Sequence, residues 1–198
     1  MRRTVLIALA LALIALPAQA EEKTRLSVVT GGTGGVYYPL GGAVANVLSK
    51  YLPGAAATAE VTSASIDNLK LVGAGKADIA FSMADSAWDG YNGTGKFHGK
   101  VPLRSIVVLY ANKTHVVTVQ GKGIERMSDL KGKRISTGAP GSGTELIALR
   151  LLEAYGIDPE KDVRREKLSV AESVGAIKDN KIDELVTRLS KVVSVEVE

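Results

Sequence analysis

A glycine-rich turn between residues 30 and 39 is the part of this sequence whose residue types and spacing best suit ligand binding. Glycines stand at positions 31, 32, 34 and 35, between a short apolar run and a helical pattern. Because glycine has no Cβ, its backbone can take a positive φ and approach a ligand closely, while the unpaired N–H groups of the helix that follows point at whatever lies there. The ligand that such a turn favours is an anion.

A second glycine turn, Gly138 to Gly143, also joins a predicted strand to a predicted helix. Ser142 lies between glycines and suits helix capping and anion binding. The nucleophile pattern G-x-S-x-G fails because residue 140 is proline, and neither His98 nor His115 has a carboxylate at a spacing typical of a catalytic triad. We therefore predict no catalytic residue and no enzyme activity.

Other motifs that bind cofactors or metals are incomplete. Gly90 to Phe97 nearly matches a phosphate-binding loop, but Phe97 stands where a hydroxyl is required. The glycines of the first turn do not fit a dinucleotide fingerprint. The chain has no cysteine and only two histidines, and Asp85 and Asp89 are the nearest carboxylate pair. We expect no cofactor and no metal.

The two turns must be held by a scaffold, and hydrophobic periodicity predicts one of alternating strands and helices. In the first half the pattern is βαβαβ, which favours a parallel sheet covered by helices. The predicted strands are Leu26–Val29, Ala57–Val61, Ala77–Phe81 and Ile106–Leu109, and the predicted helices are Tyr38–Leu52, Ser65–Ala74 and Ser82–Asn92.

The second half repeats this order after a predicted crossing between lobes at Tyr110 to His115. Its predicted strands are Val116–Val119, Arg134–Thr137 and Val163–Leu168, and its predicted helices are Thr144–Tyr155 and Ser169–Asn180. Ser169 and Glu172 have the spacing of a capping box. The two glycine turns would then face each other across a cleft at the carboxyl ends of the strands.

The N-terminus has the three parts of a secretory signal peptide: Arg2 and Arg3, an apolar run, and an A-x-A site ending at Ala20. Cleavage after Ala20 would place the mature chain in the periplasm. Loss of the two arginines lowers the formal charge from +4 to +2, and the basic residues are scattered. The chain lacks the basic stripe with interleaved aromatic residues that nucleic-acid binding needs, so we expect no nucleic-acid partner.

Several blocks of the sequence resemble the TAXI family of solute receptors of tripartite ATP-independent periplasmic (TRAP) transporters. The resemblance runs from about Leu26 to Asp183 with the motifs in the family's order. The blocks that carry it are Val29–Gly41, Ser65–Leu69, Gly75–Phe81, Asp129–Arg134 and Gly138–Glu145.

The resemblance implies an α/β fold like that of type II periplasmic binding proteins, with two lobes and mainly parallel sheets. It implies a monomer that binds a small organic anion or an amino acid such as glutamate and delivers it to the permease subunits of a TRAP transporter. The residues that it places around the ligand are Gly32, Thr33, Gly34, Gly35, Val36, Tyr37, Ser65, Asn68, Ser82, Asp85, Ser142, Gly143 and Thr144, with Tyr38 beside them.

The chain also departs from that family, whose members are longer. We divide it into a signal peptide (1–20), a first lobe (21–110), an incomplete second lobe (111–183) and a divergent end (184–198). The spacing of Leu185, Leu189, Val192 and Val193 predicts an amphipathic helix in that end, followed by a short alternating tail. We interpret the chain as a truncated receptor, either a non-functional remnant or a genuine short form. The alternative is a periplasmic sensor or adaptor domain that binds a signalling partner.

Overall fold

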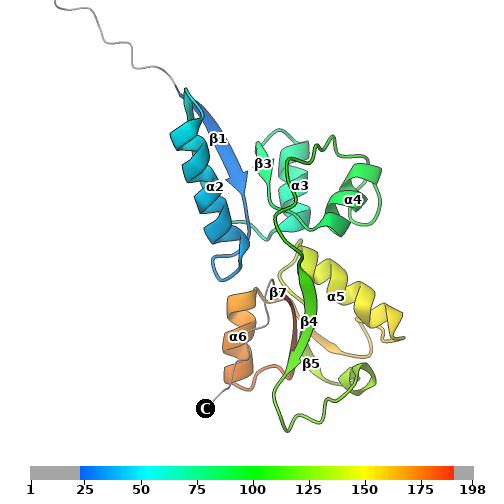
Figure 1. The fold of residues 1–198 in the computed structure, drawn as a ribbon. Helices are drawn as coiled ribbons and strands as arrows, with labels where there is room; N and C mark the ends of the chain where they lie inside the picture. The colour runs from blue at the N-terminus through cyan, green and yellow to red at the C-terminus, as the bar shows by residue number, and fades with distance from the viewer. Residues whose placement is uncertain (1–22, 190–198) are drawn as a thin grey trace, which may run out of the picture.

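The computed structural model describes residues 23–189 (Figure 1). The predicted signal peptide with its cleavage site, and the end of the divergent C-terminal segment, lie outside the described residues. No helix within the described range is both long enough and apolar enough to cross a membrane.

The first half of the chain forms a three-stranded parallel sheet in the order β2-β1-β3. Its strands are β1 (Thr24–Val29), β2 (Ala55–Glu60) and β3 (Ile79–Ala80). Three helices accompany it, α2 (Tyr37–Tyr51), α3 (Ser65–Gly73) and α4 (Ala84–Asn92). The predicted βαβαβ order is confirmed, since each strand and helix lies within a few residues of its predicted range.

The second half forms a four-stranded sheet in the order β4-β7-β5-β6. Strand β5 pairs in parallel with β6 and β7, while β4 pairs with β7 in the antiparallel sense. The elements are β4 (Lys113–Thr118), a short 3-10 helix (Met127–Leu130), β5 (Arg134–Ser136), α5 (Gly143–Ala154), β6 (Arg164–Glu166), α6 (Val170–Lys178) and β7 (Glu184–Leu189). The predicted α/β fold with mainly parallel sheets is confirmed.

The predicted helix at the start of the divergent end is wrong. Residues 184–189 form strand β7, which lies between β4 and β5 and exchanges hydrogen bonds with both. A helical spacing of apolar residues is weak evidence for a helix, because tertiary contacts can override it. Here two neighbouring strands supply the backbone partners that a strand needs. The rest of the predicted helix and tail, residues 190–198, lies outside the described residues.

The predicted strand Ile106–Leu109 is also absent. These residues run between the two sheets without strand pairing, and their side chains are exposed (Figure 1). A strand requires a neighbour for its backbone groups, and no described segment pairs with this one. Strand β4 instead begins at Lys113, three residues before the predicted start at Val116.

Each sheet has its own apolar core. Val28 of β1 packs with Ala45 and Phe81 in the first unit. In the second, Ile135 of β5 packs with Leu152 of α5 on one face, while Leu185 of β7 packs with Ala176 of α6 on the other. The helices α5 and α6 therefore cover opposite faces of the second sheet.

Asp183, just before β7, joins that strand to β5 through an ion pair. Its carboxylate accepts hydrogen bonds from the Arg134 Nη2 at 2.7 Å, Nε at 3.1 Å and backbone N–H at 3.0 Å, and from Lys122 Nζ at 3.3 Å. The Arg134 guanidinium is the main reason that the pKa of Asp183 lies well below its ordinary value, and Lys122 adds to the effect. The carboxylate is thus stabilised in its ionised form in the folded chain.

We expect Asp183→Asn to lower the free energy of unfolding at pH 7 by about 2 kcal/mol, a value reduced for the pair's partial exposure to solvent. Because the folded-state pKa lies below the unfolded value, the stabilisation is present above the ordinary pKa of 3.8 and is lost as the pH falls below it. Urea unfolding at pH 7 and at lower pH measures both effects. Asp179→Asn, which removes only an exposed pair with Lys181, is the control and should change stability little.

Candidate functional site

The amino ends of three helices meet where the two sheets come together. Gly143, the first residue of α5, packs so closely that a Cβ built on it would lie 2.7 Å from Ser65 Oγ and 2.9 Å from Met83 Cγ. Ser65 is the first residue of α3, and Met83 immediately precedes α4. We call this region the junction. It brings together Ser65 and Gly143, which the sequence analysis placed in one site.

Many polar groups at the junction bind one another. The N–H groups of Ile66 and Asp67 donate to the Gly141 carbonyl at 3.1 and 3.2 Å, so the second glycine turn caps α3 from the other half of the chain. Ser65 Oγ accepts the Met83 N–H at 3.1 Å. The N–H groups at the start of α3, which could otherwise bind an anion, are thus used by hydrogen bonds that link the two halves.

Ser142 caps α5 as the sequence predicted. Its Oγ accepts the Glu145 N–H at 3.0 Å, and its side chain is buried. Gly138 and Gly141 in this turn have φ values of 96° and 76°, which favour glycine. A Cβ on Gly138 would also lie 2.9 Å from Thr144. The turn is therefore shaped by backbone conformation, and Ser142 and Thr144 are held beside it.

The first glycine turn needs glycine for close approach and not, as predicted, for positive φ, since none of its glycines has a positive value. A Cβ on Gly34 would lie 2.9 Å from the Ala171 Cβ, at the start of α6. The turn is closed by a hydrogen bond from Gly35 N–H to the Gly32 carbonyl at 2.9 Å. This turn therefore meets the second half of the chain at α6, beside the junction.

Helix α2, which follows this turn, differs from its neighbours because no side chain caps its amino end. Its N-cap residue is Val36, and its first turn contains no acidic residue. Thr33 and Gly34 are exposed, and a Cβ on Gly32 would have no neighbour within 4 Å. The amino end of α2 thus offers a partial positive charge, with no side-chain cap and no acidic residue in the first turn of the helix.

Asn68 has a structural role in the described conformation. Its side chain is fully buried; Nδ2 donates to the carbonyls of Thr30 at 2.6 Å and Phe81 at 2.7 Å, and Oδ1 accepts from Thr62 Oγ1 at 2.6 Å. These carbonyls follow β1 and β3. Asn68 therefore ties together the carboxyl ends of two strands, and its polar groups are already bonded within the protein.

The remaining predicted residues lie along the starts of α2 and α4. The Tyr37 ring packs against Phe81 with the ring centroids 5.4 Å apart. Ser82 Oγ donates to the Met83 carbonyl at 3.0 Å, and Asp85 Oδ1 accepts the Ser86 N–H at 2.8 Å. Tyr37 therefore contributes to the first core as well as to the turn.

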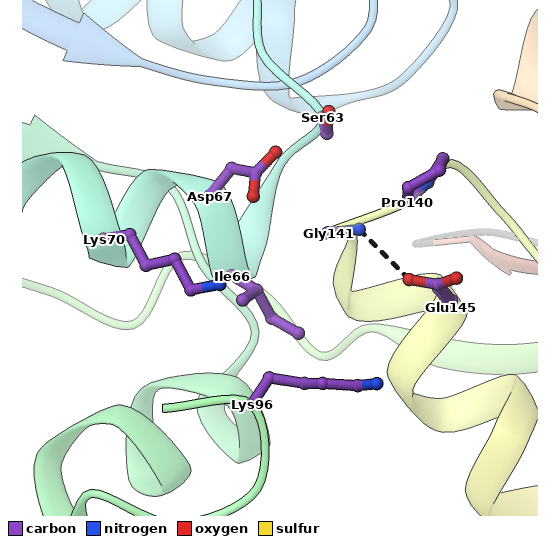
Figure 2. A pocket seen from close by; sticks show the side chains of 8 residues that line it. All are labelled: Ser63, Ile66, Asp67, Lys70, Lys96, Pro140, Gly141 and Glu145. Carbon is purple, nitrogen blue, oxygen red and sulfur yellow. Dashed lines mark hydrogen bonds between the residues drawn. The ribbon is translucent and has the colours of Figure 1, made fainter. Parts of the chain in front are cut away.

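Sequence reasoning missed a cavity of about 410 Å³ between α3 and the second glycine turn. Figure 2 shows Asp67 and Lys70 on the α3 side, Lys96 extending toward α5, and Glu145 bonded to the Gly141 N–H. The residues that line it are Ser63, Ile66, Asp67, Lys70, Lys96, Pro140, Gly141 and Glu145. None of them belongs to the predicted ligand set, although Ile66 and Asp67 lie between Ser65 and Asn68, which do.

Charge in this cavity is mixed. Glu145 already accepts the Gly141 N–H at 3.1 Å and lies 3.8 Å from Arg165 Nη2. Among the described residues, no carboxylate lies within ion-pair distance of the Lys70 or Lys96 ammonium groups. The cavity therefore presents two unpaired cations beside the Asp67 carboxylate, which suits a ligand that carries both signs of charge.

Two further polar groups lie in the segment that connects the halves. The Tyr110 hydroxyl and the Asn112 Oδ1 are buried without a hydrogen-bond partner among the described residues. Asn112 Nδ2 contacts Met83 Sδ at 3.3 Å, so this segment borders the junction. Burial raises the pKa of the Tyr110 hydroxyl. A buried polar atom without a partner is costly, and a bound ligand would reduce that cost.

Packing between the halves extends beyond hydrogen bonds. Leu146 of α5 is buried against Ile66, Leu69 and Phe97 of the first half. Arg150 of α5 donates to the Asp89 carboxylate of α4 at 2.6 Å. Helix α5 thus packs against α3 and α4 in the described arrangement of the two halves.

Ala64 stores backbone strain at the junction, with φ 92° and ψ −142° immediately before α3. We expect Ala64→Gly to raise the free energy of unfolding by about 1 kcal/mol, because glycine accepts this conformation. Ala74→Gly, at the other end of α3 with φ −89°, is the matched control and should lower stability by about 0.5–1 kcal/mol. Urea unfolding measures the change in the free energy of unfolding for both variants. If both variants lose the same stability, Ala64 is not strained.

A model of the NMT1-like family matches residues 28–195. The chain belongs to the NMT1-like family. Among solved structures, this NMT1-like chain is similar to a binding-protein component of an ABC phosphonate transporter from Pseudomonas aeruginosa. Their TM-score is 0.61 at 12% identity, over 84% of this chain and 58% of that one.

Two other solved structures show the same similarity. One is the alkanesulfonate-binding protein SsuA from Xanthomonas axonopodis pv. citri bound to MOPS, with a TM-score of 0.55 at 19% identity over 83% of this chain and 54% of that one. The other is a putative L-cystine ABC transporter protein from Listeria monocytogenes, with the same TM-score and identity over 83% and 69%. The NMT1-like chain thus has the fold of solute-binding proteins, and it spans about half the length of the first of these two.

Proposed function

We propose that this NMT1-like protein is an extracytoplasmic solute-binding protein that captures a small organic anion or an amino acid such as glutamate at the junction. The observation that carries this proposal is the first glycine turn beside the uncapped amino end of α2, in a fold shared with solute-binding proteins. Backbone amides and the helix dipole recognise a negative group there without a charged side chain.

The proposed ligand contacts are the residues predicted from the sequence around this turn, from Gly32 to Tyr37, together with Ser82, Asp85 and the turn Ser142 to Thr144. Ser65 and Asn68 support these contacts through the hydrogen bonds described above. The cavity of Figure 2 is a second position within the same junction, where Lys70 and Lys96 would hold a carboxylate and Asp67 an ammonium group. Substitutions in the first glycine turn and in the cavity distinguish these two binding positions.

We propose that ligand binding shifts the equilibrium between an open and a closed arrangement of the two halves and involves no covalent chemistry. A ligand that contacts both halves of the chain binds the closed arrangement more tightly than an open one, and only that difference in affinity shifts the population. The closed form would then be presented to the permease subunits of a TRAP transporter in the periplasm, as the TAXI resemblance implies. Two of the similar proteins are an alkanesulfonate-binding protein and a binding-protein component of a phosphonate transporter, which supports an anionic solute.

The test is a thermal-shift screen of the full chain with amino acids, dicarboxylates, sulfonates and phosphonates. A ligand present at one hundred times its Kd should stabilise the protein by about 2.7 kcal/mol. The variant Gly32→Asp adds a carboxylate at an open position of the turn and should abolish the shift for anions, whereas Gly99→Asp, at an equally open position in the loop before β4, should not.

Lys70→Met and Lys96→Met locate the ligand. If they abolish the shift while Gly32→Asp preserves it, the cavity and not the turn holds the anion. A screen in which no solute stabilises the wild-type chain contradicts the proposed function itself. Affinity capture from membranes then distinguishes transporter permease subunits from a sensor kinase, the partner that the adaptor alternative requires.

A further inference from the structure

The segment that crosses between the two halves, residues 101–112, carries two buried polar atoms without a partner. The segment forms no helix, strand or turn. The Tyr110 hydroxyl and the Asn112 Oδ1 have no hydrogen-bond partner among the described residues. The great majority of buried polar groups in native structures are paired with the protein, with water or with a ligand. These two atoms therefore need a partner that the described part of the chain does not supply.

Contacts place Asn112 at the junction. Its Nδ2 lies 3.3 Å from Met83 Sδ, and a Cβ on Gly143, the first residue of α5, would lie 2.9 Å from Met83 Cγ. Because the Asn112 nitrogen faces the sulfur, a weak acceptor, the amide oxygen is left to accept from another group. Tyr110 lies two residues earlier, and residues two apart in an extended chain face the same side. Figure 1 shows this segment passing the amino end of α5 on its way to β4.

These two atoms differ in chemistry from the rest of the proposed site. The two glycine turns offer backbone N–H groups, which are donors and suit a carboxylate. Asn112 Oδ1 is an acceptor, and the Tyr110 hydroxyl accepts as well as donates. An ionised sulfonate or dicarboxylate has no donor for such a group, whereas the ammonium group of an amino acid has three. A solute that satisfies both parts of the junction therefore carries a negative group and an ammonium group.

We propose that Tyr110 and Asn112 determine the solute class of the junction by accepting hydrogen bonds from an ammonium group, so that the protein selects an amino acid over an anion of the same carbon skeleton. This inference rests on the proposed function and narrows the class of solute that it names. In the ligand-free chain the two unpaired atoms disfavour the folded state. Only a solute with a donor removes that cost when it binds, which makes the gain specific to amino acids.

L-Glutamate and glutarate are matched probes, because they share a carbon chain with two carboxylates and differ only in the ammonium group. Calorimetric titration of the full chain should show that glutamate binds at least tenfold more tightly than glutarate. Tyr110→Phe removes only the hydroxyl, and Asn112→Leu removes the acceptor. Each should weaken glutamate binding about tenfold and change glutarate binding less than twofold. Asn112→Asp should increase the preference for glutamate, because a carboxylate attracts the ammonium group and repels glutarate.

The melting temperature of the ligand-free protein is a second readout. Loss of an unpaired buried hydroxyl should raise the melting temperature of Tyr110→Phe by about 2–4 °C. Tyr91→Phe is the matched control, since Tyr91 is 54% exposed. This control should change neither the melting temperature nor the preference for glutamate.

Three outcomes of these titrations are decisive. Wild-type binding of glutarate as tight as that of glutamate, or equal loss of both probes in Tyr110→Phe and Asn112→Leu, would overturn the inference and leave the proposed function intact. If Asp67→Asn removes the preference and the substitutions at Tyr110 and Asn112 do not, the ammonium group lies in the cavity of Figure 2 and the inference is wrong. A wild-type chain that binds no solute of the screen contradicts the proposed function as well.

Discussion

Glu184→Gln is expected to raise the free energy of unfolding at pH 8 by about 3 kcal/mol, because the wild-type carboxylate is then ionised in a buried position. Glu184 is fully buried in β7, and both of its carboxylate oxygens lack a hydrogen-bond partner among the described residues. It lies beside Ile135 and opposite Thr118 in the ladders. Burial raises the pKa of Glu184 from 4.5 to about 7.

The sign of the pH dependence follows from this shift. Because the folded-state pKa lies above the unfolded value, the folded chain binds more protons between pH 4.5 and about 7, and stability falls as the pH rises through that window. Glutamine has nearly the same shape but does not titrate. The gain from Glu184→Gln should therefore be close to zero at pH 4 and reach its full size above pH 7.

Urea unfolding curves collected from pH 4 to pH 8 measure this difference. Glu153→Gln, at an exposed position of α5, is the control and should show no such growth with pH. A gain that is the same at every pH would mean that packing, and not ionisation, is responsible. A loss at pH 8 would show that Glu184 has a partner when ionised.

Gly143→Val is expected to have the second large effect, because its side chain would enter the contact between α5, α3 and α4. The Cβ alone would approach Ser65 Oγ to 2.7 Å and Met83 Cγ to 2.9 Å. Overpacking of this kind typically costs about 1–3 kcal/mol, and we expect the upper end because the Ser65 Cβ, 3.1 Å away, cannot move without its own backbone. Any solute bound across the junction should lose at least tenfold in affinity.

Gly175→Ala is the matched control for this substitution. Gly175 lies within α6, and a Cβ there would have no neighbour within 4 Å. Alanine should stabilise the helix by about 0.5–1 kcal/mol. Thermal unfolding and titration of both variants distinguish a specific effect at the junction from a general intolerance of glycine substitution; equal stability of Gly143→Val and wild type would contradict the close packing.

Local sequence signals predicted much of this fold. The capping box of Ser169 and Glu172 is present, with the Glu172 N–H bonded to Ser169 Oγ and the Ser169 N–H bonded to the Glu172 carboxylate. Ser142 caps α5 as expected. These predictions succeeded because a cap depends only on residues within one helical turn.

The errors concern residues whose structure depends on distant partners. Residues 184–189 have a spacing compatible with a helix, but β4 and β5 on either side make them a strand. Ile106 to Leu109 have strand-forming side chains but no strand beside them among the described residues. Neither outcome can be read from a local window, since pairing is decided by the order of strands in the sheet.

The candidate site was predictable only where it depends on local sequence. The glycine turns follow strands, so their location at the carboxyl ends of β1 and β5 could be expected. The cavity with Lys70 and Lys96 could not, because it forms where α3 approaches a turn more than seventy residues later in the chain. The sequence predicted that Asn68 lines the ligand site, but only the structure shows that its amide bonds to the carbonyls of Thr30 and Phe81.

The most direct test of the account is an amide NMR titration of the full chain with the best solute from the screen. We expect the largest shifts at the N–H groups of residues 31–38 and 142–145, because backbone amides at these two turns are proposed to bind the anion. Saturable shifts confined to other parts of the chain, with both turns unchanged, would contradict it.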